Sequence, residues 1–196
     1  MILITGAKGF IGSTLVSYLL KMGHDVKGIS EEITDIEKLR PHFKDAEFVV
    51  HLAAKVNSGD FFQVNVGGTM QVVKLCIEYG CKLINTSSIA VGNDYAISKA
   101  LAEELVKLYA KDQCLQAVTI RPCIIYDERT DSTRYPFISR NYPLGKLVRD
   151  IENIILTYNF KKYNVYNIGG LGQKLYFRKV VQIYRKIKRI CLKFLS

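Results

Sequence analysis

The stretch MILITGAKGFIG (Met1–Gly12) joins a short apolar run to a helical pattern through a glycine-rich turn, and this order decides the fold. The run Met1–Thr5 is apolar enough for a strand buried within a sheet. From Phe10 to Met22, apolar residues recur at helical spacing, and Gly23 follows as the expected helix stop. We therefore expect a strand, a tight turn and a helix in direct succession.

Strand and helix patterns continue to alternate along the chain. Strands are expected at 24–29, 47–51, 81–86 and 116–120, and helices at 35–43, 61–79 and 95–111. Such alternation implies right-handed crossovers and a parallel sheet. After Pro122 the pattern loosens, and it predicts a loop over 127–145, a helix over 147–158, a strand over 163–168 and a basic helix over 174–195.

Composition narrows the class of protein. The 196 residues include 28 Lys+Arg and 18 Asp+Glu, a formal net charge of +10, and 48% are hydrophobic. These values fit a chain that folds around one core and that has an anionic partner. No apolar run reaches the ~20 residues of a membrane span, and the apolar start lacks the basic region of a secretory signal. The five cysteines have no metal-ligand spacing, so we expect reduced thiols, no bound metal and a cytoplasmic protein.

The glycine turn has the chemistry of a phosphate site. Gly6, Gly9 and Gly12 would permit a tight turn, close approach of the backbone to a pyrophosphate, and packing of helix on strand. Amides at the start of the helix also favour negative charge. A purely structural turn is the alternative. Because a strand precedes the turn and a helix follows it, we predict dinucleotide binding and an α/β fold, a Rossmann-type doubly wound parallel sheet.

The three-then-three glycine spacing resembles the short-chain dehydrogenase/reductase superfamily, in particular the NAD-dependent epimerase/dehydratase family of its extended branch. Further matches are HLAA at 51–54, VNVGGT at 64–69, and Arg121-Pro122 followed by Tyr126, although Asp127 stands where the family has glycine. The resemblance covers roughly residues 1–170. It implies a cofactor-binding core over 1–126 and a reduced substrate-binding region over 127–196, which together form one compact unit.

The resemblance also implies which residues bind the cofactor. They come from the glycine turn, the end of the second strand, the segment after His51, and two later positions: Gly6, Gly9, Phe10, Ile11, Gly12, Glu31, Glu32, Ile33, Leu52, Ala53, Ala54, Lys99 and Pro122. Carboxylates at Glu31 and Glu32, with no arginine nearby, favour the ribose hydroxyls of NAD over the 2′-phosphate of NADP. The alternative is that these carboxylates only cap the following turn.

Tyr95 and Lys99 lie four residues apart in a predicted helix, so they share one face. A free tyrosine, with a pKa near ~10, is a poor base at neutral pH. A nearby ammonium favours the phenolate, which lets tyrosine move a proton while hydride moves to or from a nicotinamide. By itself such a pair is usually a solvated face. The resemblance places the third catalytic group at Ser88, with Ser87 as the alternative, and the family has a longer loop between this serine and the tyrosine.

The resemblance implies a nucleotide-sugar enzyme of polysaccharide biosynthesis. Ser87–Val91 (SSIAV) and Pro143–Gly145 (PLG) are similar to UDP-hexose 4-epimerases and 4-ketoreductases. We therefore predict C4 epimerisation or 4-keto reduction of a UDP- or dTDP-hexose. The missing loop leaves open a reductase of another small carbonyl compound, or a catalytically degenerate NAD-binding module for interaction or sensing. Extended members dimerise through two helices, which implies a homodimer through 61–79 and 95–111.

The segment 173–196 combines an apolar stripe with many basic residues. It fits a last helix that docks on the sheet with its basic side in water. It also fits a helix that makes peripheral contact with an anionic membrane. No basic-aromatic recognition module is visible in the sequence, so we expect no nucleic-acid partner.

Overall fold

Six parallel strands form the centre of the computed structural model, which describes residues 1–57, 59–112, 114–127 and 141–169. Across the sheet the strands are β2 (Val26–Ile29), β1 (Ile2–Thr5), β3 (Phe48–His51), β4 (Lys82–Thr86), β5 (Ala117–Pro122) and β8 (Val165–Ile168). Every neighbouring pair is parallel. From β1 the chain adds β2 on one side and then crosses back to add β3 and the later strands on the other side. The expected doubly wound α/β architecture is therefore confirmed.

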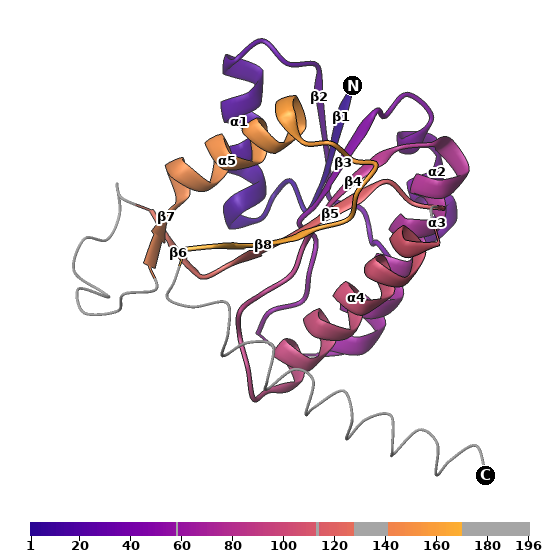
Figure 1. The fold of residues 1–196 in the computed structure, drawn as a ribbon, viewed down its shortest axis with the longest axis vertical. Coiled ribbons are helices and arrows are strands. Elements are labelled where there is room, and N and C mark those ends of the chain that lie inside the picture. Colours follow the sequence, from indigo (N-terminus) through magenta and orange to yellow (C-terminus); the bar gives the residue numbers. More distant parts are fainter. Residues whose placement is uncertain (58, 113, 128–140, 170–196) are drawn as a thin grey trace.

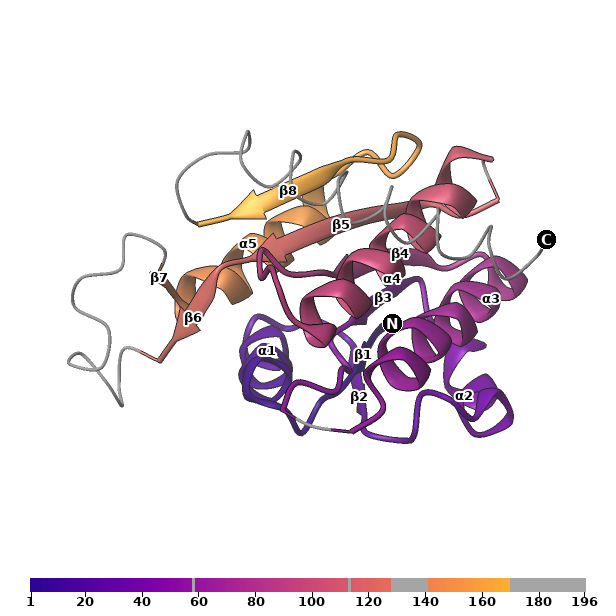
Figure 2. The same cartoon turned by 90° about the horizontal axis from the view of Figure 1, so that it is seen from below.

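Helices cover both faces of this sheet (Figures 1 and 2). On one face lie α1 (Phe10–Lys21) and α5 (Leu144–Thr157). On the other lie α2 (Ile36–Phe43), α3 (Thr69–Tyr79) and α4 (Asp94–Lys111). Because side chains alternate along a strand, β1 contributes to both cores, with Ile2 and Ile4 facing α1 and Leu3 facing α2 and α3.

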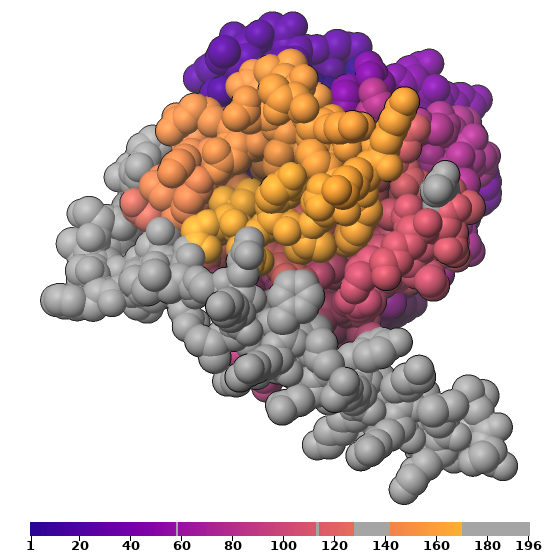
Figure 3. Space-filling view, viewed as in Figure 1, coloured from indigo at the N-terminus to yellow at the C-terminus, as the bar shows by residue number. Residues whose placement is uncertain are grey.

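The segment that includes α5 and β8 completes the same sheet and the same core. β8 pairs with β5, and Leu147 and Ile151 of α5 pack in one cluster with Ile4. In the space-filling view this segment, in orange, occupies the middle of the face shown, below the indigo N-terminal part of the chain (Figure 3). The division at residue 126 into a core and a substrate-binding region stays a prediction.

Two local features differ from the sequence pattern. A small parallel pair, β6 (Ile124–Tyr126) and β7 (Asn141–Pro143), lies partly where a loop was predicted over 127–145. Its strands have three residues each, too few for a recognisable period. The predicted helix over 61–79 begins with π-helical turns, η1 (Phe62–Gly68), and continues as α3.

The predicted basic helix over 174–195 lies outside the described residues. Its docking on the sheet or on an anionic membrane therefore stays a prediction. Within the ranges that the structure describes, no helix is both long and apolar enough to cross a lipid bilayer.

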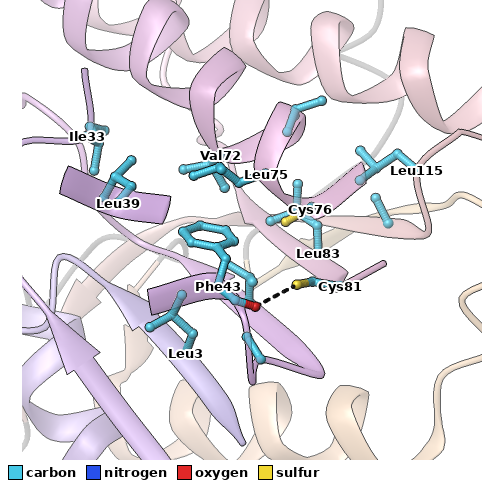
Figure 4. Close-up of a cluster of buried hydrophobic side chains, with 14 of the residues drawn as sticks. Leu3, Ile33, Leu39, Phe43, Val72, Leu75, Cys76, Cys81, Leu83 and Leu115 are labelled. Atoms are coloured by element: carbon cyan, nitrogen blue, oxygen red, sulfur yellow. Dashed lines mark hydrogen bonds between the residues drawn. The ribbon is translucent and has the colours of Figure 1, made fainter. Parts of the chain in front are cut away.

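Phe43 is the largest fully buried side chain and lies at the centre of the cluster between the sheet and α2–α3, close to Leu3, Leu75 and Leu83 (Figure 4). We expect Phe43→Ala to lower the free energy of unfolding by about 3–5 kcal/mol, because it removes a ring from a closed core. Leu108→Ala is the control, since Leu108 is 60% exposed, and it should change stability by no more than about 0.5 kcal/mol. Urea unfolding measures both values, and equal losses would contradict this account of the core.

Candidate functional site

The site lies at the carboxyl ends of β1 and β3, where the order in which the chain adds strands to the sheet reverses. Thr5 and His51, the last residues of these strands, are register partners. The glycine turn follows Thr5, and the segment Leu52–Ala54 follows His51. Ligands of open α/β sheets bind in the crevice at such a point.

A cavity of about 410 Å³ opens between these two segments and the end of β2. Its lining includes these predicted cofactor residues: Gly6, Gly9, Glu31, Glu32, Ile33, Leu52, Ala53 and Ala54. Five residues that were not predicted to bind the cofactor also line this cavity: Lys8, Ser30, Thr34, Lys55 and Val64. Of these, Lys8 had a recognisable signal, because it is the one cation inside the glycine turn.

The glycine turn has the shape of a phosphate cradle. Gly6 has a φ of 70°, and a Cβ there would lie 2.7 Å from the Ala53 nitrogen. A Cβ at Gly12 would lie 2.2 Å from the Gly6 carbonyl oxygen, so helix and turn touch closely. Gly9 is the N-cap of α1 and has no side chain to occupy the first amides of the helix. A dinucleotide pyrophosphate fits this arrangement.

The remaining turn residues take different places. Phe10 begins α1 and is 53% exposed, while Ile11 is half-buried and packs against the core beneath α1. Neither lines the cavity described above. Pro122 ends β5 and is buried, also away from the cavity lining. Contacts of these three residues with a cofactor stay predictions.

Both carboxylates after β2 have local partners. Glu31 accepts a hydrogen bond from the Ser30 amide (2.8 Å), and Glu32 accepts one from the Thr34 hydroxyl (3.0 Å). Ile33 is 4% exposed and packs against Gly68, where an added Cβ would lie 2.5 Å from Ile33 Cγ1. Neither of these two bonds caps the following turn, because Ser30 precedes Glu31 and the Thr34 donor is a side-chain hydroxyl. Both carboxylates line the cavity, and their contact with a cofactor stays a prediction.

Tyr95, Lys99 and Glu103 occupy successive turns of α4. Lys99 is only 4% exposed, so this face of the helix is not solvated. Burial lowers the pKa of Lys99 to about 8, and the negative charge of Glu103 partly opposes that shift. Glu103 in turn forms a buried ion pair with Arg121 of β5, with Arg121 Nε 2.7 Å from a carboxylate oxygen.

The two candidate serines have different roles in the structure. Ser87 is buried, and its hydroxyl donates to the Lys99 carbonyl oxygen (3.4 Å), which joins β4 to α4. The Ser88 oxygen accepts a hydrogen bond from the Ala90 amide (3.0 Å), and Ser88 lies near enough to Tyr95 to lower the pKa of its phenol. The short connection thus brings Ser88 to Tyr95, and it favours Ser88 over Ser87 as the third group.

Burial raises the pKa of the Tyr95 phenol, and the nearby Ser88 hydroxyl acts in the opposite direction. Asn93 caps the start of α4 by accepting from the Ala96 amide (2.8 Å), which holds the first turn that carries Tyr95. The Phe61 ring lies edge-on beside Tyr95, with the ring centroids 6.4 Å apart. The phenol therefore has an aromatic wall on one side and a hydroxyl on another.

A model of the NAD dependent epimerase/dehydratase family matches residues 2–156, most of the chain. The chain belongs to the NAD-dependent epimerase/dehydratase family. The members of this family are enzymes and their cofactor is NAD, as the sequence predicted. The glycine cradle described above fits that cofactor.

Curated relatives in this family have related but different activities. A UDP-glucose 4-epimerase of Vibrio cholerae is 31% identical over 169 residues, which cover 64% of this chain and 52% of that protein. A 2-alkyl-3-oxoalkanoate reductase of Stenotrophomonas maltophilia is 28% identical over 168 residues, covering 64% of this chain and 51% of the reductase. The chain therefore spans about half the length of these relatives.

Solved structures show the same fold. UDP-N-acetylglucosamine 4-epimerase from Bacillus cereus matches with a TM-score of 0.73 and 19% identity, covering 94% of this chain and 83% of that one. The Bordetella bronchiseptica enzyme WbmG, solved with NAD and UDP, matches with a TM-score of 0.71 and 21% identity, covering 86% and 72%. At such identities the comparison establishes the fold alone.

Gly6 and Gly80 provide a matched pair for testing the cradle, since both have a φ of 70°. An added Cβ at Gly80 would meet nothing within 4 Å, whereas one at Gly6 would collide with Ala53. We expect Gly80→Ala to cost about 1–2 kcal/mol of stability for the left-handed backbone and to leave NADH binding intact. Gly6→Ala should abolish NADH binding, measured by fluorescence titration. Equal NADH affinities in the two variants would contradict the cradle.

Proposed function

We propose that the protein is an NAD-dependent enzyme that acts at C4 of a UDP- or dTDP-hexose, by epimerisation or by reduction of a 4-keto sugar. The observation that carries this proposal is the placement of Tyr95 one helical turn from the buried Lys99, with Ser88 near enough to lower the pKa of the Tyr95 phenol. These groups follow β4, next to β3 and the glycine cradle. Nucleotide-sugar epimerases among the relatives support the choice of substrate.

The proposed chemistry assigns one task to each side chain. NAD, when bound, supplies the acceptor or donor of the hydride. Tyr95 takes the proton of the C4 hydroxyl, and Ser88 donates a hydrogen bond to the carbonyl oxygen that develops there. Lys99 is protonated below its pKa of about 8, and its positive charge lowers the free energy of the Tyr95 phenolate.

A second candidate is a reductase of a small, less polar carbonyl compound. Only the short segment Ile89–Asn93 lies between Ser88 and α4, and the Phe61 ring lies beside Tyr95. An aromatic wall suits an apolar substrate, and one relative is a 2-alkyl-3-oxoalkanoate reductase. Turnover of UDP-glucose or of a 3-oxo acid with NAD or NADH distinguishes the two candidates.

We further propose that two copies associate through η1–α3 and α4, the helices that correspond to the dimer helices of extended family members. Light scattering of the purified protein tests this pairing. The cytoplasmic location that we propose fits the four cysteines of the described ranges, which are all free thiols.

Tyr95→Phe should lower turnover by about 10²–10⁴, because the variant keeps the ring but has no proton to exchange. NADH affinity should stay within about 2-fold, since the ring still packs against Phe61. Tyr109→Phe, on the same helix, is the control and should keep full activity. Conversion of UDP-glucose to UDP-galactose, followed by proton NMR, measures turnover. Full activity in Tyr95→Phe would refute the assignment of this residue.

Activity should fall as the pH rises through about 8, because Lys99 then loses the charge that stabilises the phenolate. Glu103→Gln removes the anion that raises the pKa of Lys99, so the fall should move to lower pH. Glu104→Gln is the control, since Glu104 pairs with Lys107 on the helix surface. A pH–rate profile of each folded variant measures the shift, and identical profiles would contradict the coupling.

A further inference from the structure

A row of polar side chains crosses the buried face of the sheet towards α3 and α4. Thr5, His51, Asn85 and Thr119 are register partners on four neighbouring strands, and each is 0–1% exposed. The row divides into two hydrogen-bonded halves. Asn85 donates to Thr119 (3.3 Å), which Tyr163 also contacts, and Thr5 bonds to His51 (2.8 Å). Only the Thr5–His51 half adjoins the cofactor cavity, which Gly6 and Leu52 line.

The Thr5–His51 pair belongs to a longer chain of hydrogen bonds. The donors at the two ends of this chain determine which group donates in each of the bonds between them. At one end the Ala53 amide donates to Thr5 Oγ1 (3.3 Å). At the other end Thr69 Oγ1 donates to the Asn65 carbonyl oxygen (2.6 Å), so its single proton is used and it accepts from His51 Nε2 (3.1 Å). His51 Nδ1 is then left as the acceptor for the Thr5 hydroxyl. Every donor has one acceptor, and the imidazole is neutral with its proton on Nε2.

Asn65 extends the connection to the helix that carries Tyr95. Its side-chain oxygen accepts from the Lys55 amide (2.7 Å), and its nitrogen donates to the Lys55 carbonyl (3.0 Å) and to Ser98 Oγ (2.9 Å). The Ser98 hydroxyl donates to the Tyr95 carbonyl oxygen (2.8 Å). Asn65 and Ser98 are both buried. The segment that lines the cofactor cavity is thus tied through η1 to the first turn of α4.

We propose that His51 is a positioning residue that acts as a neutral connector with a fixed tautomer, joining the cofactor-binding segment at Ala53 to the helix that carries Tyr95 and Lys99. This inference rests on the proposed function of that site. His51 itself is separated from the cavity by Leu52 and Ala53, which line it. Its role is therefore to hold two parts of the site in register, and not to exchange a proton with a substrate.

The surroundings of His51 oppose its protonation. Burial is the main cause and the positive charge of Lys99 adds to it, so that the pKa of His51 falls to about 3. A second ring proton would also point at Thr5 Oγ1, which already accepts from Ala53, and would leave the Thr5 hydroxyl without its acceptor. The elements packed around the ring provide Thr5, Thr69 and the Lys99 cation, with no carboxylate among these contacts to stabilise a second charge.

The first experiment reads the tautomer directly. Long-range ¹H–¹⁵N NMR spectra of the ¹⁵N-labelled protein contain three histidines, and the signals of His51 are those that disappear in His51→Gln. We expect the Nε2–H tautomer, unchanged between about pH 5 and 8. An Nδ1–H tautomer, or titration of His51 within that range, would overturn the proposal. This measurement needs neither substrate nor cofactor.

The second experiment tests whether the chain links the two parts of the site, with NADH as the probe. Thr5→Val and Thr69→Val break the chain at different points, although the two threonines do not bond to each other. We expect each to weaken NADH binding by about 5-fold, and the double variant to be no weaker than the weaker single variant. Thr119→Val is the control, because it removes an equally buried hydroxyl from the other half of the row.

We expect Thr119→Val to lower stability while leaving the NADH dissociation constant unchanged, and its effects should add to those of Thr69→Val. An unchanged NADH affinity in Thr69→Val, or full additivity of Thr5→Val and Thr69→Val, would refute the connector. If the unsubstituted protein failed to bind NADH, the proposed function would fall. The tautomer of His51 would then still test whether the hydrogen-bonded chain is present, because that measurement needs no cofactor.

Discussion

The close approach of the turn after β1 to the backbone after β3 is the contact on which the site depends. A side chain at Gly6 would collide with the backbone of Ala53, so the two strand ends meet only because glycine stands there. The same approach forms one edge of the cofactor cavity and places Thr5 within hydrogen-bond reach of the Ala53 amide. A single steric constraint therefore serves both the phosphate cradle and the buried polar chain.

In β1 and β3, the buried polar residues lie at the carboxyl ends of the strands. The bodies of β1 and β3 bury Leu3 and Val49 against the helices, whereas their last residues are Thr5 and His51. Buried polar groups cost free energy unless they are hydrogen-bonded. The Thr5–His51 chain meets that requirement fully, so the edge is ordered and its groups are held in fixed orientations, which suits a site where proton positions matter.

The three proposed catalytic groups lie close together although the segment between Ser88 and α4 is short. Ser87 joins β4 to α4 through the Lys99 carbonyl, and Ser88 lies near enough to Tyr95 to lower the pKa of its phenol. The loop that the family resemblance led us to expect between this serine and the tyrosine is therefore not needed to bring these groups together. What its absence changes is the wall beside Tyr95, which here includes Phe61. Under the proposed function, we expect this chain to differ from its longer relatives in substrate preference.

Local patterns in the sequence determined the alternation of strands and helices, the glycine turn and the helical spacing of Tyr95 and Lys99. Each depends on residues close together in the chain, where periodicity and glycine geometry act directly. Tertiary structure alone decided that Lys99 is buried beside an ion pair and that Ser88, not Ser87, lies near the Tyr95 phenol. It also decided that two three-residue strands pair in a second sheet that begins just after β5. Those outcomes depend on the environment supplied by distant segments, because burial and hydrogen-bond partners are set by what packs against a residue and not by its neighbours in sequence.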